Sequence, residues 1–373
     1  MLPTDERPVA AIFRAPLFNA SETFVQTHAA GLRRYRPVVA GLEDMGNARP
    51  ELRPPALIVE REGLRLKLLG SAPRLLRRLR EARPALVHAH FATDGLLALP
   101  LAEALGVPLV TTLHGFDVTR GRAALLRSGR PGWMRYALLG RRLRERGDLF
   151  VAVSDAIRRR ALAHGFPAGR TITLLNGVDL AAFGGGTPEP GLVLHVGRLV
   201  EKKGTSLLLR AFAEVAQRRP EARLVVIGDG PLRARLEREA GERAVFTGTL
   251  PPDEVARWMS RAWLLAAPSV TAADGDSEGL PTVVCEAAAA SLPVVASDHS
   301  GLPEAVVDGE TGFLVPEGDA AALAARLETV LASPELRARM AGAARRLAEQ
   351  RFDSARQIAA LEDLYDRVTG RCG

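Results

Sequence analysis

The chain has 373 residues, of which 47% are hydrophobic and 25% charged, and its formal net charge is +7. This length exceeds what one hydrophobic core usually serves, so we expect two α/β domains. No stretch approaches the roughly 18 uninterrupted apolar residues of a membrane-spanning helix. The first residues do not form a secretory signal pattern, and Cys285 and Cys372 are badly placed for a structural disulfide. We therefore expect a cytoplasmic protein.

Short apolar runs alternate with amphipathic helical segments in the first half of the chain. Such runs are typical of parallel strands that are buried on both faces. We expect strands at 8–15, 36–42, 55–60, 85–91, 108–115, 148–154 and 171–176. They predict an N-terminal Rossmann-like domain over residues 1–183.

Glycine and proline dominate residues 183–190, which have neither helical nor strand periodicity and therefore predict a linker. After the linker the alternation resumes, which predicts a second doubly wound domain over residues 184–350. A C-terminal helix over 351–373 is expected to pack back on the N-terminal domain. The fold class is thus α/β, with two Rossmann-like domains facing each other across a cleft. The second set of strands is expected at 192–199, 222–230, 244–250, 263–269, 293–298 and 312–316.

Residues 61–83 mix leucines with basic residues and are interrupted by Gly70 and Pro73. A basic amphipathic helix can rest on an anionic membrane, which would place the protein at the inner face of the cytoplasmic membrane. Leucines that face a sheet and arginines that face water explain the same pattern, so both interpretations stay open. Nucleic acid is not expected as a partner, because the arginines are dispersed and no aromatic platform accompanies them.

Three histidines fall near the ends of two neighbouring expected strands. His88 and His90 alternate on one strand and point to the same side, and His114 ends the next strand. Three imidazoles could bind a metal ion, but no fourth ligand is evident. Histidines at such a place also bond to acceptor hydroxyls or to the backbone.

A basic segment connects the first strand of the second domain to the helix that follows. It runs from Gly197 and Arg198 through Lys202 and Lys203 to Gly204. Cations that converge at a helix N-terminus can bind a diphosphate, since arginine forks across two oxygens and lysine acts as a point charge. A solvated basic loop is the alternative interpretation.

The strongest single pattern begins at Glu278 and ends at Glu286. Pro281 suits the first turn of a helix, which puts Glu278 just outside it and Glu286 about one and a half turns further in. Gly279 allows close approach of a ligand, and the N–H groups from Leu280 onward suit a phosphate or sugar hydroxyls. A carboxylate can also hold the vicinal hydroxyls of a ribose. An acidic helix start followed by one exposed glutamate would explain the segment without a ligand.

These motifs together resemble the family-four retaining glycosyltransferases of the GT-B fold, and the resemblance covers essentially the whole chain. Other motifs are most similar to bacterial enzymes that assemble exopolysaccharides such as colanic acid: SETFV (21–25), VHAHFA (87–92), HGFD (114–117) and DGDSEGLP (274–281). The family motifs are NGVD (176–179), GRLVEKKG (197–204), GDGP (228–231), EGLP (278–281) followed by Glu286, and SGLPEAV (300–306).

The resemblance implies a role for each matching residue. Glu278 would contact the transferred sugar, and Glu286 the ribose of the donor. Arg198 and Lys203 would bind its pyrophosphate and offset the charge that grows on the leaving group, and His114 would lie beside the reacting sugar. The implied catalytic set is His114, Arg198, Lys203 and Glu278. The implied donor-binding set is Gly197, Arg198, Lys203, Gly230, Glu278, Gly279, Leu280, Pro281 and Glu286, and the acceptor-side set is Ser21, Glu22, His90 and Asp117.

The chain departs from the family at its first loop, where many relatives have two glycines and this sequence has Pro16 to Glu22. Asp274 and Asp276 resemble the Asp-x-Asp motif of the other major glycosyltransferase architecture, in which a divalent ion bridges the donor phosphates. Here Arg198 and Lys203 supply that charge. We therefore expect no cofactor and no obligate metal.

The expected function is transfer of a hexose from a nucleoside-diphosphate sugar to a hydroxyl of a glycan or lipid-linked acceptor. The pathway would be the synthesis of an exopolysaccharide or another surface glycan. The alternatives are a sugar-nucleotide epimerase or phosphorylase of the same fold, a transferase acting on a small natural product, and a non-catalytic subunit that binds sugar nucleotides. The sequence leaves open the base, the hexose, the acceptor, the linkage and the oligomeric state.

Overall fold

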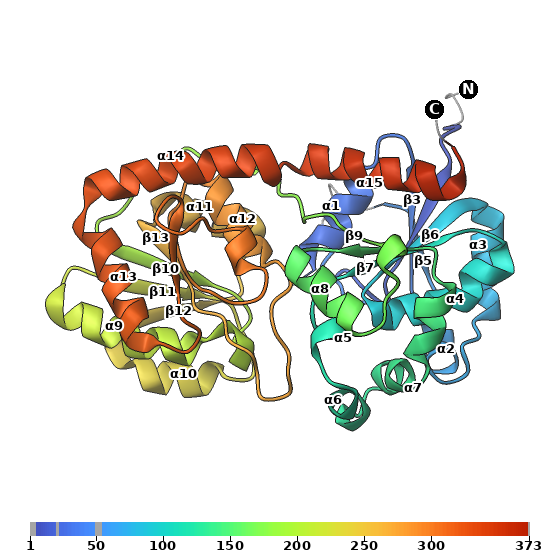
Figure 1. Cartoon of the computed structure of the whole chain (residues 1–373), viewed down its shortest axis with the longest axis horizontal. Coiled ribbons are helices and arrows are strands. Elements are labelled where there is room, and N and C mark those ends of the chain that lie inside the picture. Colours follow the sequence, from blue (N-terminus) through green and yellow to red (C-terminus); the bar gives the residue numbers. More distant parts are fainter. Residues whose placement is uncertain (1–4, 20–21, 49–53, 372–373) are drawn as a thin grey trace. The chain divides into compact units, whose positions relative to one another are not determined.

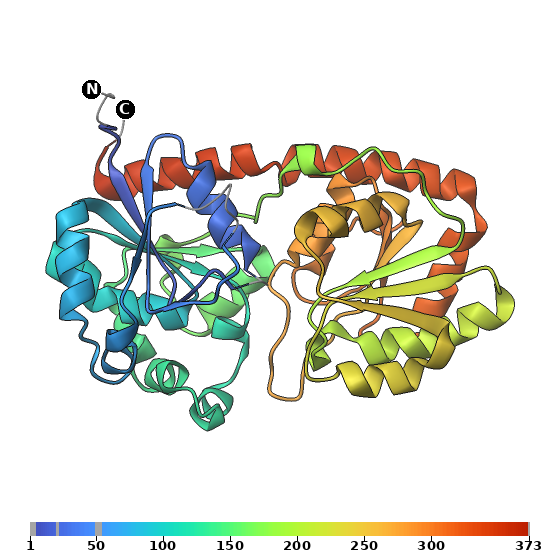
Figure 2. The same cartoon turned by 180° about the vertical axis from the view of Figure 1, so that it is seen from behind.

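The computed structural model describes residues 5–19, 22–48 and 54–371, and its contacts divide the chain into two compact units (Figure 1). Unit 1 comprises Met1–Leu175 and Ala355–Gly373, and unit 2 comprises Asn176–Ser354. The Gly/Pro stretch 183–190, predicted as a linker, lies inside unit 2. Helices cover both faces of the large sheet in each unit, as Figure 2 shows from behind.

A seven-stranded parallel sheet forms the centre of unit 1 in the described residues, in the order β5-β3-β1-β6-β7-β8-β9. All five residues of β1 are buried, as expected for a strand that helices cover on both faces. The strands are β1 (Val9–Phe13), β3 (Arg36–Gly41), β5 (Ala56–Ile58), β6 (Pro84–His90), β7 (Leu109–Leu113), β8 (Leu149–Ala152) and β9 (Thr171–Thr173).

The helices of unit 1 follow the strands in chain order. One of them begins in an unusual way, because the buried carboxylate of Glu62 caps it by accepting bonds from the N–H groups of Arg74 and Leu75, each at 3.0 Å. The helices are α1 (Thr23–Gly31), α2 (Gly63–Leu69), α3 (Pro73–Ala82), α4 (Ala92–Leu105), α5 (Phe116–Thr119), α6 (Arg122–Arg127), α7 (Pro131–Arg146), α8 (Asp155–Ala163) and α15 (Ser354–Thr369).

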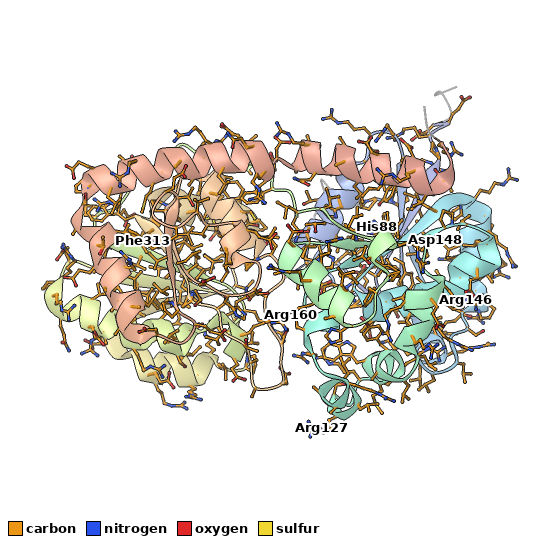
Figure 3. All side chains as sticks on the ribbon, in the orientation of Figure 1. His88, Arg127, Arg146, Asp148, Arg160 and Phe313 are labelled. Carbon is orange, nitrogen blue, oxygen red and sulfur yellow. The ribbon has the colours of Figure 1, made fainter. Side chains whose placement is uncertain are left out.

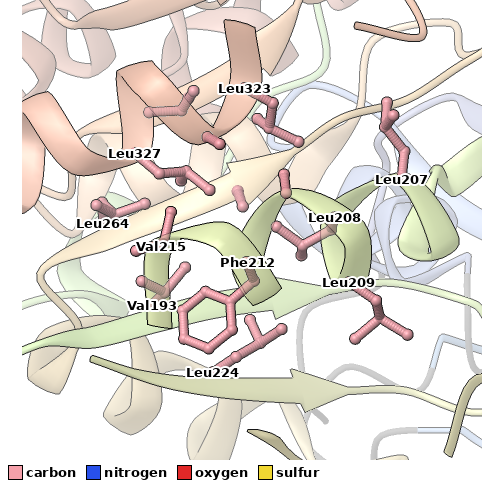
Figure 4. Packing of buried hydrophobic residues seen from close by; sticks show 14 of the residues in the cluster. Val193, Leu207, Leu208, Leu209, Phe212, Val215, Leu224, Leu264, Leu323 and Leu327 are labelled. Atoms are coloured by element: carbon pink, nitrogen blue, oxygen red, sulfur yellow. The ribbon is translucent and has the colours of Figure 1, made fainter. Parts of the chain in front are cut away.

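Unit 2 contains a six-stranded parallel sheet in the order β12-β11-β10-β13-β14-β15. Phe212 fills the core beneath this sheet with Val193 and Leu327, all of them buried (Figure 4). The strands are β10 (Leu192–Val196), β11 (Arg223–Ile227), β12 (Ala244–Gly248), β13 (Leu264–Ala267), β14 (Val294–Ser297) and β15 (Gly312–Val315). The helices are α9 (Thr205–Arg218), α10 (Arg233–Ala240), α11 (Pro252–Arg261), α12 (Thr282–Ala289), α13 (Ala320–Ala332) and α14 (Pro334–Arg351).

Two parallel α/β sheets confirm the predicted fold class, and every strand that the sequence predicted is present in a shorter form. The small parallel pair of β2 (Pro16–Leu17) and β4 (Glu43–Asp44) was missed, since two residues carry no periodicity. None of the helices in the described ranges is both long enough and apolar enough to span a membrane.

The C-terminal helix α15 is bound to unit 1 through one buried carboxylate. Glu362 accepts hydrogen bonds from the backbone N–H groups of Arg33, Arg34 and Tyr35 at 2.8, 2.7 and 3.2 Å. Its oxygens are shielded from water, because the residue is only 2% exposed. Three donors therefore depend on one side chain that is far away in the sequence.

Replacing Glu362 by alanine should destabilise unit 1 by about 3 kcal/mol, because three buried N–H groups lose a charged acceptor. Asp363→Ala is the matched control on the same helix, since its ion pair with Arg34 is exposed and should contribute less than about 1 kcal/mol. Urea unfolding followed by circular dichroism measures both. Equal losses in the two variants would contradict the assigned role of Glu362.

Candidate functional site

Three loops of unit 2 gather where the parallel strands end at their carboxyl edge, the usual ligand position in such sheets. They follow β10, β11 and β13, which are neighbours in the sheet. The loop after β10 is bonded to the next one through backbone groups: Gly197 N–H to Ile227 O at 2.9 Å, and Leu199 N–H to Asp229 O at 2.8 Å. The predicted diphosphate loop thus has a defined position on the sheet.

Glycines make this contact between the loops possible. A Cβ on Gly228 would lie 2.0 Å from the carbonyl oxygen of Gly197, and one on Gly230 would lie 2.5 Å from that of Leu199. The observed role of Gly230, predicted as a donor-binding residue, is therefore close packing against the loop that carries Arg198. The guanidinium of Arg198 is exposed.

Lys203 is oriented by the turn that follows it. Gly204 has φ +65, and a Cβ there would lie 1.8 Å from the carbonyl oxygen of Pro268, so only glycine fits between the turn and the start of α9. The ammonium group of Lys203 lies 2.8 Å from Oε1 of Glu278. Two residues that the sequence predicted for one site are thus an ion pair.

The carboxylate of Glu278 is buried, with the residue 6% exposed. Burial alone would raise its pKa, but the charges of Lys203 and Lys202 and the bond from Lys203 outweigh that effect and lower the pKa below its usual value. Glu278 is therefore ionised at neutral pH. An anion held beside a cation at a strand edge can bind sugar hydroxyls without taking up a proton.

The second lysine of the pair belongs to a different contact. Lys202 lies 3.2 Å from Oδ1 of Asp276, and Asp274 accepts a bond from the N–H of Asp276 at 3.0 Å. The two carboxylates of the Asp-x-Asp sequence thus serve the loop after β13. Over the ranges that the structure describes, no three His, Cys, Asp or Glu side chains are grouped so that they could hold a metal ion.

The start of α12 differs by one residue from the prediction. Pro281 is the cap residue and Thr282 begins the helix, so Pro281 lies just before the first turn. Leu280 is buried, and the carbonyl oxygen of Glu278 accepts a bond from the hydroxyl of Ser300. Gly279 separates these two positions, and Glu286 lies within α12 and is partly buried.

Sequence reasoning missed His299, which follows β14 beside this loop. Its Nδ1 lies 2.9 Å from Oε2 of Glu317, and the side chain is 4% exposed. Its Nε2 is buried and has no hydrogen-bond partner within the described residues. No motif announces this histidine, because its meaning depends on the distant Glu317.

A second group of charged residues lies at the carboxyl edge of the unit 1 sheet. Arg14, directly after β1, forks onto both oxygens of Glu22 at 2.7 and 2.8 Å and contacts Asp94 at 2.6 Å. Its guanidinium also lies 4.4 Å from the ring centre of Phe91. Glu22 is thus held by a buried arginine that sequence reasoning did not select, and Ser21 lies outside the described residues.

His90 and His114 are bonded to each other at this edge, with Nδ1 of His90 3.0 Å from Nε2 of His114. Burial, together with nearby cationic groups, lowers the pKa of both imidazoles well below the ordinary value, so both are neutral. One ring must then donate and the other accept. Phe24 packs 4.4 Å from the ring centre of His114.

His88 is part of the core instead. Its Nδ1 lies 2.6 Å from the hydroxyl of Tyr365 and its Nε2 lies 2.7 Å from that of Thr112, and Figure 3 shows it in the interior of unit 1. Both ring nitrogens are occupied, which leaves none for a metal ion. Burial lowers its pKa to about 3.

Asp117, predicted on the acceptor side, holds the backbone of its own loop. Its oxygens accept bonds from the N–H groups of Ala92 at 2.8 Å, Gly115 at 2.9 Å and His114 at 3.2 Å. Burial raises its pKa to about 6 in spite of these bonds. The carboxylate therefore orients the loop that carries His114.

Two family models match the chain in succession. The model "Glycosyltransferase Family 4" matches residues 21–182, and "Glycosyl transferases group 1" matches residues 183–347. Together they extend over both units.

Curated relatives agree with the models. The chain is 36% identical over 251 residues to the putative colanic acid biosynthesis glycosyltransferase WcaL of Salmonella typhimurium, covering 64% of this chain and 59% of the relative. The chain thus spans less than two thirds of that protein. It is 31% identical over 301 residues to a GDP-mannose-dependent alpha-(1-6)-phosphatidylinositol monomannoside mannosyltransferase of Mycolicibacterium smegmatis, covering 74% of this chain and 75% of the relative.

The fold is also found among solved structures. HepE of Anabaena, in complex with UDP and glucose, superposes with a TM-score of 0.79 at 21% identity, over 96% of this chain and 99% of HepE. The two sheets and this similarity identify the GT-B fold. By its sequence and its fold, this chain belongs to the family 4 glycosyltransferases of group 1.

Proposed function

We propose that this chain transfers a hexose from a nucleoside-diphosphate sugar to a hydroxyl of a glycan or lipid-linked acceptor, with retention at the anomeric carbon. The observation that carries the proposal is the ion pair of Lys203 and Glu278, at 2.8 Å. It joins a cation at the start of α9 to an ionised carboxylate before α12. A sugar diphosphate needs such a pair, one charge for its phosphates and one for its hydroxyls.

The donor would lie along the carboxyl edge of the unit 2 sheet. Lys203 and the exposed Arg198 would bind the pyrophosphate, and Glu286 in α12 would bind the ribose. HepE, of the same fold, is described in complex with UDP and glucose, which supports a nucleotide sugar as the ligand here. The nearby acids Asp274 and Asp276 are engaged within unit 2, so the lysines and Arg198 carry the charge toward phosphate.

Catalysis would depend on stabilising the leaving group. As the bond between the anomeric carbon and the phosphate oxygen breaks, negative charge grows on the diphosphate beside Arg198 and Lys203. The acceptor oxygen bonds to the same face of the sugar, and its proton passes to the departing phosphate oxygen. No protein base is required in this scheme, which agrees with a Glu278 whose lowered pKa makes it a poor base.

On the acceptor side, the neutral pair of His90 and His114 would contact the reacting sugar and the incoming hydroxyl. Arg14 holds Glu22 close to the same sheet edge. The similarity to WcaL, described for colanic acid biosynthesis, supports a growing surface glycan as acceptor. The name of the mycobacterial relative includes a lipid-linked sugar, which supports the lipid-linked alternative.

The first experiment screens nucleoside-diphosphate hexoses with a lipid-linked glycan acceptor and measures release of nucleoside diphosphate. We expect release only when an accepted donor and an acceptor are both present, and we expect it to continue in chelator. Proton NMR of the first product from an α-linked donor should show an α linkage. A β-linked product would overturn retention, and interconversion of free sugar nucleotides without an acceptor would favour an epimerase.

The two glutamates should separate kinetically, because they bind different parts of the donor. Glu278→Gln removes the charge beside the sugar and should lower kcat about 100-fold or more. Glu286→Gln should raise the donor KM about tenfold while kcat changes less. Steady-state kinetics with one donor measures both, and unchanged constants in both variants would remove these carboxylates from the site.

Removing Lys203 should change the pH dependence as well as the rate. In Lys203→Ala, Glu278 stays buried without its main counter-charge, so its pKa rises and the carboxylate is lost at a higher pH than in the wild type. The acidic limb of the kcat/KM profile should therefore move to higher pH, and kcat/KM at neutral pH should fall about 100-fold.

Lys202→Ala is the matched control, since that lysine pairs with Asp276 and contributes less to the low pKa of Glu278. It should move the acidic limb less than Lys203→Ala does. An acidic limb that stays in place in Lys203→Ala would separate the ion pair from the catalytic charge state.

A further inference from the structure

Most of the large apolar side chains that the described residues expose lie on two helices of unit 1. Eight such side chains are exposed in all, and α2 and α7 carry five of them. The other three, Met45, Val245 and Val307, lie elsewhere in the chain. The five are Leu64 at 63% exposure, Leu68 at 54%, Leu69 at 73%, Met134 at 38% and Leu138 at 59%.

The two helices lie against each other, so the five side chains belong to one surface (Figure 1). The guanidinium of Arg135 on α7 donates to the carbonyl oxygen of Leu68 on α2 at 2.7 Å. A Cβ on Gly132 would lie 3.8 Å from the stem of Lys67. Leu64 and Leu68 are four residues apart, as are Met134 and Leu138, so each helix presents one exposed apolar row. We call this surface the α2–α7 face.

The charge around this face is almost entirely positive. Helix α2 has the sequence GLRLKLL, which carries two cations and no acid. Helix α7 contributes five arginines, and its single acid, Glu145, is paired with Arg141. Exposed Arg65 and Arg142 lie in the apolar stretches themselves. Apolar side chains among unopposed cations suit a surface that is both greasy and negatively charged.

We propose that the α2–α7 face docks on an anionic lipid bilayer, with its leucines in the headgroup boundary and its arginines and lysine on the lipid phosphates. A second copy of the chain fits this face poorly, because pairing two copies would bring arginines against arginines. The proposal does not depend on the proposed transferase activity. It concerns only residues of unit 1.

The structure also divides the sequence pattern that suggested membrane contact. In segment 61–83, Leu75 and Leu79 of α3 are buried against unit 1 and so is Leu66 of α2. Those leucines follow the alternative interpretation, in which apolar residues face the sheet. Only the outer leucines of α2 are available, and their partners come from α7, which lies far along the chain and was not part of the pattern.

The test is co-sedimentation of the full chain with two kinds of vesicle, phosphatidylcholine alone and equal parts of phosphatidylcholine and phosphatidylglycerol. We expect binding to the mixed vesicles only, and a fall in binding as salt is added. The variant Leu64→Ser/Leu68→Ser/Leu69→Ser should lose binding about tenfold or more. The variant Arg65→Gln/Lys67→Gln/Arg142→Gln should lose it as well and keep the leucines.

Val245→Ser/Val307→Ser is the matched control, since it removes exposed apolar side chains from unit 2 and should bind vesicles as the wild type does. Because every changed residue is exposed or partly exposed, circular dichroism should show unchanged folding, and the charge variant keeps the test valid if the serine variant unfolds. Equal binding to both vesicles, no binding to either, or an equal loss in the control overturns the proposal. Concentration-dependent dimers that the serine variant abolishes would assign the face to self-association instead.

Discussion

The ion pair between Lys203 and Glu278 is the interaction on which the unit 2 site depends. A carboxylate with 6% exposure would be protonated without a counter-charge, and a lysine at that place would have no reason to stay fixed. Each group keeps the other charged and positioned. The surrounding glycines serve this pair, because Gly204 fits under the carbonyl of Pro268 and Gly228 under that of Gly197, which brings the loops of three strands together.

Buried carboxylates that bind backbone N–H groups perform the same task elsewhere. Glu62 begins α3, Asp117 fixes the loop of His114, and Glu362 attaches α15 to the chain near Tyr35. Each satisfies two or three donors that no helix or sheet could satisfy. A buried N–H without a partner costs about 1–3 kcal/mol, so these few acids determine where loops and helix ends lie. They are structural residues that share a residue type with the catalytic ones.

The sequence predicted the strands because short runs of valine, isoleucine and leucine between amphipathic helices are typical of parallel strands buried on both faces. It also predicted the Lys203 and Glu278 segments, since glycines, cations and acids cluster there. It could not distinguish His88 from His90, because both alternate on β6 and only Tyr365 and Thr112 show that His88 belongs to the core. It missed Arg14 and His299 for the same reason, since their partners Asp94 and Glu317 are distant in the sequence.

The histidines at the unit 1 edge show how one residue type acquires two functions. His88 has both nitrogens bonded, so its tautomer is fixed and its ring is inert. In the pair of His90 and His114 one proton is shared between Nδ1 and Nε2, so the tautomer of one ring determines that of the other. If His90 donates from Nδ1, then the neutral ring of His114 must carry its proton on Nδ1, and that group becomes a donor for a sugar hydroxyl. His90 would then act by fixing the donor of His114, a role that follows from their 3.0 Å contact.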